Sequence, residues 1–185
     1  MPLSYVFIIG LGIFFYSVKS FGKVSLDMNK NWTKFDSIFK KYSVRYSVPF
    51  NWLKAICMNE SALGLAPSVA LGLKTPFDVE GSKSSDGKSW GIMQMTIPTA
   101  KDYDAGASPE KLNNPEYSID LAARFLNYLM SQFSQTDSRY AEYVFKSYNQ
   151  GAGNTRKEIK TGKGYADEYW VRIKRHLIKI EGESK

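Results

Sequence analysis

The stretch "ICMNESALG", residues 56–64, places one glutamate, Glu60, in a run that is otherwise almost wholly apolar or small. Pro49 suits the first turn of a helix that runs toward Ser61. On such a helix the residues three, four and seven positions before the glutamate share its face, and all are apolar: Cys57, Ile56 and Leu53. The spacing predicts that Glu60 faces the interior of the domain near the C-terminal end of its helix.

A lone carboxylate in this position has a chemical consequence. Low dielectric and the negative end of the helix dipole both favour its protonated form, and no cation of the same helix is placed to pair with it. A carboxylic acid that stays neutral near pH 7 can act as a general acid. Two plainer interpretations stay open: Glu60 pairs with a distant arginine such as Arg124, or it emerges into solvent at the helix end.

The composition narrows the class of protein. With 185 residues, 43% hydrophobic and 15% aromatic, the chain can bury one good core. Its net charge of +7 favours anionic surfaces such as cell walls and membranes. The sequence has no zinc-finger spacing and no aromatic-basic pattern of an RNA-binding sheet, so a nucleic-acid partner is not expected. Cys57 is the only cysteine and His176 the only histidine, which disfavours Cys-His catalysis.

The N-terminus differs from the rest of the chain. Residues 3–18, "LSYVFIIGLGIFFYSV", carry no charge, and Lys19 follows. We interpret residues 1–20 as a secretory signal or a short membrane anchor, which predicts export and allows membrane association through residues 3–18. Whether the segment is cleaved stays open, because no Lys or Arg precedes the apolar run.

The remaining chain is predicted to be mainly helical. Helical patterns occupy about residues 35–46, 114–133, 138–149 and 165–180. Residues 76–89 are expected to form a solvated polar loop, since the order of their acidic residues does not fit a calcium loop. No metal and no cofactor are expected. Gln94 interrupts an apolar run, and Tyr148 points inward where "YNQGAGN" ends a helix, so both need hydrogen-bond partners.

Three blocks in this order, "NESALG", "GIMQMTIPTA" and "SYNQGAGN", followed by "YWVRI", resemble the signature of the soluble lytic transglycosylase family. The resemblance covers about residues 35–178. It implies a lysozyme-like helical fold over residues 21–185, with a polar loop region lining a glycan cleft. The longer loop before "SWG", and Tyr165 and Ala166 before the last tyrosine, depart from the pattern of the family.

The resemblance also implies roles for individual residues. Glu60 is the catalytic acid and base, with Tyr148 beside it as the second catalytic residue. Five more residues are expected to bind substrate: Ser61, Met93, Gln94, Asn149 and Tyr169.

The implied reaction is non-hydrolytic cleavage of the β-1,4 bond between N-acetylmuramic acid and N-acetylglucosamine in peptidoglycan, which leaves a 1,6-anhydro end. Action in the periplasm, in the cell envelope or on a virion would fit. Two alternatives stay open: a goose-type-lysozyme-like muramidase in which Asp86 positions water, and a glycan-binding module without catalysis.

Overall fold

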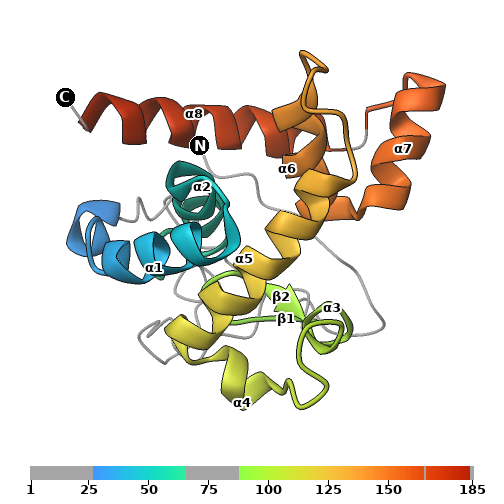
Figure 1. Cartoon of the computed structure of the whole chain (residues 1–185). Coiled ribbons are helices and arrows are strands. Elements are labelled where there is room, and N and C mark those ends of the chain that lie inside the picture. Colours follow the sequence, from blue (N-terminus) through green and yellow to red (C-terminus); the bar gives the residue numbers. More distant parts are fainter. Residues whose placement is uncertain (1–26, 66–87, 165, 184–185) are drawn as a thin grey trace, which may run out of the picture.

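A computed structural model describes residues 27–65, 88–164 and 166–183 (Figure 1). The expected mainly α fold is confirmed: eight α-helices, a short 3-10 helix and one small hairpin make up the described part of the chain. The predicted boundary at residue 20, the apolar run 3–18 and most of the polar loop, including Asp86, lie outside the described residues.

The first half of the described chain supplies two of the packed helices. After the 3-10 helix η1 (Met28–Asn31) come α1 (Asp36–Tyr46) and α2 (Phe50–Ser61). Pro49 immediately precedes α2, one residue before the position expected for it. The helix ends because Ala62 turns into the left-handed region with φ of 52°. Glu60 therefore lies in the last turn of α2, as the spacing predicts.

The second half of the chain contains the remaining elements. The hairpin pairs β1 (Ser89–Trp90) with β2 (Met95–Thr96) in antiparallel register. Six helices follow: α3 (Ile97–Lys101), α4 (Pro109–Leu112), α5 (Pro115–Ser131), α6 (Tyr140–Gln150), α7 (Ala152–Thr161) and α8 (Asp167–Glu183). In Figure 1, α5 runs through the middle of the molecule, with the hairpin, α3 and α4 below it and α8 across the top.

Two of these elements differ from the sequence-based expectation. The helix expected to end at "YNQGAGN" does end there, at Gln150, but a further helix that was not expected, α7, begins at Ala152. Gly151 has φ of 83°, so it ends α6 and changes the direction of the chain before α7 begins. The hairpin was not expected either, because two-residue strands are too short to show an alternating pattern.

The core forms where α2, α5, α6 and α8 meet. One apolar stripe of α5 is buried: Ile119, Ala122, Ala123, Leu126 and Leu129. Asn114 caps α5 by accepting a hydrogen bond from the backbone of Tyr117, and Pro115 opens the helix. α2 packs against α8, and α6 packs against both α5 and α8. This arrangement brings Glu60 on α2 close to residues near the start of α8.

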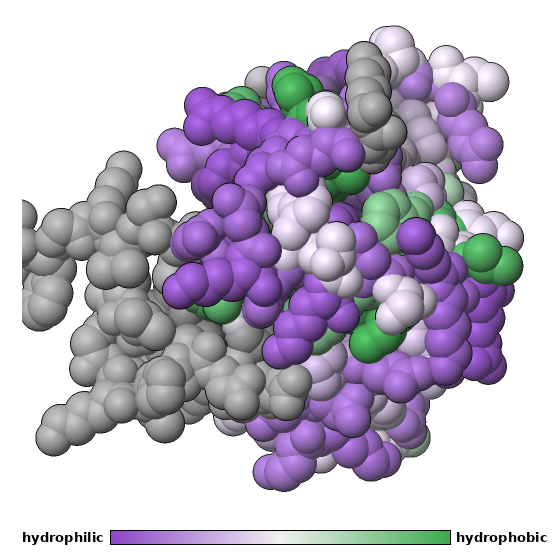
Figure 2. Space-filling model, turned by 90° about the vertical axis from the view of Figure 1, so that its left-hand side faces the viewer, coloured by the Kyte–Doolittle hydropathy of each residue, from purple (hydrophilic) through white to green (hydrophobic). Residues whose placement is uncertain are grey.

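The surface is mostly polar. Hydrophilic residues dominate the face in Figure 2, and the hydrophobic residues on it are scattered. Among the described helices, none is both long enough and apolar enough to span a bilayer.

Candidate active site

Glu60 lies on the wall of a cleft of about 560 Å³. Four parts of the fold enclose this cleft: the end of α2, the hairpin with the start of α3, the middle of α5, and the end of α6. The lining residues are Glu60, Ser89, Gln94, Met95, Thr96, Thr99, Phe125, Tyr148, Asn149, Gln150 and Gly151. Among these described residues Glu60 carries the only ionisable group apart from the phenol of Tyr148, so the cleft presents mainly neutral polar groups and one acid.

The surroundings of Glu60 keep its proton bound to unusually high pH. Burial raises its pKa to about 6, against the stabilising effect of Tyr169, Asn59 and Arg172 on the carboxylate. The hydroxyl of Tyr169 donates to Glu60 Oε1 at 2.7 Å, and Asn59 Nδ2 donates to the same oxygen at 3.4 Å. The carboxyl group is therefore protonated at pH values below about 6. When it is ionised, the hydrogen bonds from Tyr169 and Asn59 hold the carboxylate in place.

Arg124 is not the partner of Glu60. Its guanidinium binds Asp120 at 2.8 Å and the hydroxyl of Tyr46 at 2.9 Å. The interpretation of Glu60 as the ion-pair partner of Arg124 is wrong, because Arg124 pairs with Asp120 and binds Tyr46.

Two tyrosines occupy the site and have different partners. Tyr148 lines the cleft, but its hydroxyl donates to the backbone oxygen of Met93 at 2.9 Å, and the structure records no hydrogen bond between it and Glu60. Tyr169 is only 3% exposed and binds Glu60 directly. Burial raises the pKa of both phenols well above the usual value, so both stay neutral donors. The expectation of substrate contact for Tyr169 is corrected, because its side chain lies behind Glu60.

Ser61 also lies behind the cleft. Its side chain is 1% exposed, and its Oγ donates to Ile92 O at 2.7 Å and accepts from Gly64 N at 3.0 Å. The substrate-binding role expected for Ser61 is corrected for this reason. The hydroxyl ties the end of α2 to the loop of the hairpin, and so places Glu60 relative to the opposite wall of the cleft.

The hairpin loop, Gly91 to Gln94, is held by backbone contacts. Gly91 has φ of 71°, and a Cβ on it would lie 2.0 Å from Leu112 O, so only glycine fits there. Met93 is fully buried, which corrects the expectation that it lines the cleft. Gln94 does reach the cleft, and its Nε2 donates to Gly91 O at 2.7 Å. Its amide oxygen accepts no hydrogen bond that the structure records.

The structure adds cleft residues that sequence reasoning missed. Phe125 of α5 lines the cleft and packs on Tyr148, with ring centroids 5.3 Å apart. Thr96 and Thr99 contribute hydroxyl groups from the hairpin and α3. Phe125 lies beside the buried stripe of α5, so helical spacing alone could not reveal its role. Asn149, which was expected to bind substrate, does lie on the cleft wall.

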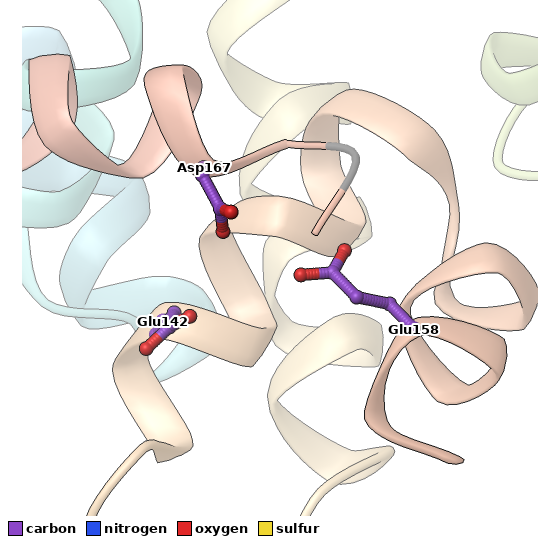
Figure 3. A group of neighbouring side chains, drawn as sticks. All are labelled: Glu142, Glu158 and Asp167. Atoms are coloured by element: carbon purple, nitrogen blue, oxygen red, sulfur yellow. The ribbon is translucent and has the colours of Figure 1, made fainter. Parts of the chain in front are cut away.

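A second group of acidic side chains lies away from the cleft. Figure 3 shows Glu142, Glu158 and Asp167 pointing toward one another from α6, α7 and the start of α8. Their oxygens lie within 4.8 Å of one another, a spacing that could hold a cation. The ammonium of Lys146 pairs with all three carboxylates, so this cation belongs to the protein itself.

The fold of this chain resembles that of a protein of known structure. A search of curated proteins gives no match. Among the solved structures, the chain is similar to an inactive mutant of the lytic transglycosylase Slt from Pseudomonas aeruginosa, with a TM-score of 0.56 and 21% identity. The match covers 78% of this chain but only 21% of that one, so it shows a shared fold over about a fifth of the longer protein.

A family model gives the more specific result. The model described as the transglycosylase SLT domain matches residues 37–171, which include Glu60, the hairpin loop, the end of α6 and the start of α8. Because this match spans well over half of the chain and confirms the resemblance seen in its motifs, the protein belongs to the transglycosylase SLT domain family.

Proposed function

We propose that the protein is a peptidoglycan lytic transglycosylase, which cleaves the β-1,4 bond between N-acetylmuramic acid and N-acetylglucosamine and leaves a 1,6-anhydro end. One observation carries the proposal: Glu60, a carboxyl group whose pKa is raised to about 6, lies on the cleft wall of a transglycosylase SLT domain. Glycosidases that use water or an enzyme nucleophile ordinarily need two carboxyl groups. One carboxyl group suffices when the substrate supplies the nucleophile.

In the proposed reaction Glu60 acts twice. Its protonated carboxyl group gives the proton to the glycosidic oxygen, the bond from the muramoyl C1 to that oxygen breaks, and the N-acetylglucosamine leaves as an alcohol. The N-acetyl group of the muramoyl sugar assists at C1. The Glu60 carboxylate then takes the proton of the muramoyl 6-hydroxyl, whose oxygen bonds to C1 and closes the anhydro ring. No water is consumed, and Glu60 ends in its original protonated state.

The neighbours of Glu60 suit this cycle. Tyr169 donates to the carboxylate that exists between the two proton transfers, and its pKa is too high for it to compete as an acid. Gln94 and Asn149, both on the cleft wall, have the donors and acceptors that sugar amides and hydroxyls require. Tyr148 supports the reaction by holding the hairpin loop through Met93 while its side chain lines the cleft.

We also propose that the protein acts outside the cytoplasmic membrane, where peptidoglycan lies. The apolar run at residues 3–18 supports export or anchoring, and the net charge of +7 favours association with an anionic wall.

Mass spectrometry of the products released from peptidoglycan tests the reaction. The wild-type protein is expected to release muropeptides with 1,6-anhydro ends, and Glu60→Gln is expected to release none. Glu181→Gln, which removes an exposed carboxylate on α8, serves as the matched control and should keep activity. Products with reducing ends, about 18 Da heavier from the added water, would overturn the proposal in favour of hydrolysis. Binding of glycan without any product would instead support a binding module.

A further inference from the structure

Lys146 is an unusual residue for the interior of a small helical protein. Its side chain on α6 is 1% exposed, although lysine is rarely buried without a specific partner. Its Nζ forms ion pairs with Glu142, Glu158 and Asp167, and the pair with Glu142 measures 2.9 Å. Burial alone would lower the pKa of this amine, but the three carboxylates outweigh that effect and raise it. Lys146 is therefore a permanent cation at the junction of three helices.

The partners of Lys146 lie on elements that build the active site. Asp167 is the first residue of α8, two positions before Tyr169, which holds Glu60. Glu158 lies on α7 and accepts a hydrogen bond from Gln150, a residue of the cleft wall, at 2.7 Å. Continuous polar contacts thus run from the cleft wall through Lys146 to the start of α8.

The turn before α8 is shaped to allow this contact. A Cβ on Gly164 would lie 1.9 Å from Asp167 Oδ2, so a side chain at position 164 would displace the carboxylate from Lys146. Asp167 itself is 67% exposed. The pair of this exposed carboxylate with a buried ammonium adds a link between the first turn of α8 and α6, and the ammonium cannot leave the interior without losing its other partners.

We propose that Lys146 is a positioning residue of the active site: by joining α6 and α7 to the first turn of α8, it fixes Tyr169 in hydrogen-bonding contact with Glu60. The inference rests on the proposed role of Glu60 as the acid and base of the reaction. Lys146 therefore influences the pKa of Glu60 through the position of the Tyr169 hydroxyl.

The test measures the titration of the Glu60 carboxyl group by ¹³C NMR on the full chain, with the Glu60→Gln variant to identify the resonance. Lys146→Met removes the buried cation that three carboxylates share and will lower the stability, so Asp167→Asn is the main variant. Asp167→Asn removes only the ion pair between Lys146 and α8. It also removes one negative charge from a cluster in which three carboxylates surround one ammonium. Glu142→Gln is the matched control, because it removes a carboxylate that pairs with Lys146 from the same helix.

The expected result follows from the geometry. Asp167→Asn weakens the hydrogen bond from Tyr169, which stabilises the carboxylate, so the Glu60 titration moves to higher pH. A purely electrostatic effect would have the opposite sign, because removing a negative charge favours ionisation of a nearby carboxyl group. The charged and titratable side chains that interact with Glu60 from the described elements are Cys57 on α2, Tyr148 on α6, and Tyr169 and Arg172 on α8. None of these is changed in Asp167→Asn.

A double variant separates positioning from other causes. In the Tyr169→Phe background, Asp167→Asn should produce no further upward shift, because the group through which it acts is gone. An upward shift that persists in this background, a shift of equal size in Glu142→Gln, or no shift in Asp167→Asn would each overturn the inference.

The NMR result does not depend on catalysis. If the expected titration pattern appears but peptidoglycan yields no anhydro product, the proposed reaction is refuted and the positioning role of Lys146 stands. If anhydro product forms and the titration pattern is absent, the reaction stands and the positioning role is refuted.

Discussion

Replacing Tyr169 by phenylalanine tests how the protein controls its acid. The change removes the hydroxyl that donates to Glu60 Oε1 at 2.7 Å and keeps the buried ring. A hydrogen bond to a charged acceptor contributes about 1.5–3 kcal/mol, and one pKa unit corresponds to about 1.4 kcal/mol. Because the hydroxyl stabilises the carboxylate form, its loss should raise the pKa of Glu60 from about 6 by about one to two pH units.

The assay is the pH dependence of kcat/KM for the release of soluble muropeptides, which reports ionisations of the free enzyme. The proposed reaction needs protonated Glu60 at the start, so activity falls as the pH rises through the Glu60 pKa. In Tyr169→Phe this fall should move to higher pH, while the rate at low pH should decrease because the carboxylate between the two steps is less stable.

Tyr148→Phe is the matched control. It removes a second buried hydroxyl of the same site, but one that donates to the backbone of Met93 and not to Glu60. Its kcat/KM should fall without a comparable shift of the pH profile. If Tyr148→Phe moved the profile and Tyr169→Phe did not, the assignment of Tyr169 as the partner of Glu60 would be refuted.

Three further predictions concern stability, each measured by urea unfolding. Glu60→Gln should raise the free energy of unfolding at pH 7 by about 2 kcal/mol and leave it unchanged at pH 4, because ionisation costs stability as the pH rises from the ordinary pKa of 4.5 through about 6. Ser61→Ala should cost about 1–3 kcal/mol, because it leaves a buried N–H group and a buried carbonyl without their partner. Gly91→Ala should prevent stable folding, because its Cβ would lie 2.0 Å from Leu112 O, whereas Gly153→Ala, with open space around the Cβ, should be neutral or stabilising.

Much of this protein could be predicted from residue spacing, because local periodicity reports which side of a helix is buried. The apolar residues before Glu60 placed it on the inner face of α2, and that face is buried in the structure: Leu53, Ile56 and Cys57 are fully buried. The helix predicted at about 114–133 is α5, because apolar residues recur along it with the 3.6-residue period. The raised pKa of Glu60 followed from the same local argument.

The partners of these residues depended on tertiary structure. Sequence reasoning named Tyr148 as the tyrosine beside Glu60. The hydroxyl that binds the carboxyl group comes instead from Tyr169, which lies 109 residues after Glu60 in the chain. It also placed Ser61 and Met93 at the substrate, although both are buried. A motif shows that residues act at one site, but it cannot show which of them touch the substrate and which hold the others.

The sequence by itself determined that one acid would lie on the inner face of a helical domain, because helix periodicity is a property of neighbouring residues. Only the tertiary structure decided what holds that acid. α8 meets α2 because their apolar faces pack together, and Lys146 joins the start of α8 to α6 through an ion pair between residues 21 positions apart. Such contacts depend on how whole helices pack, and no local pattern encodes their geometry.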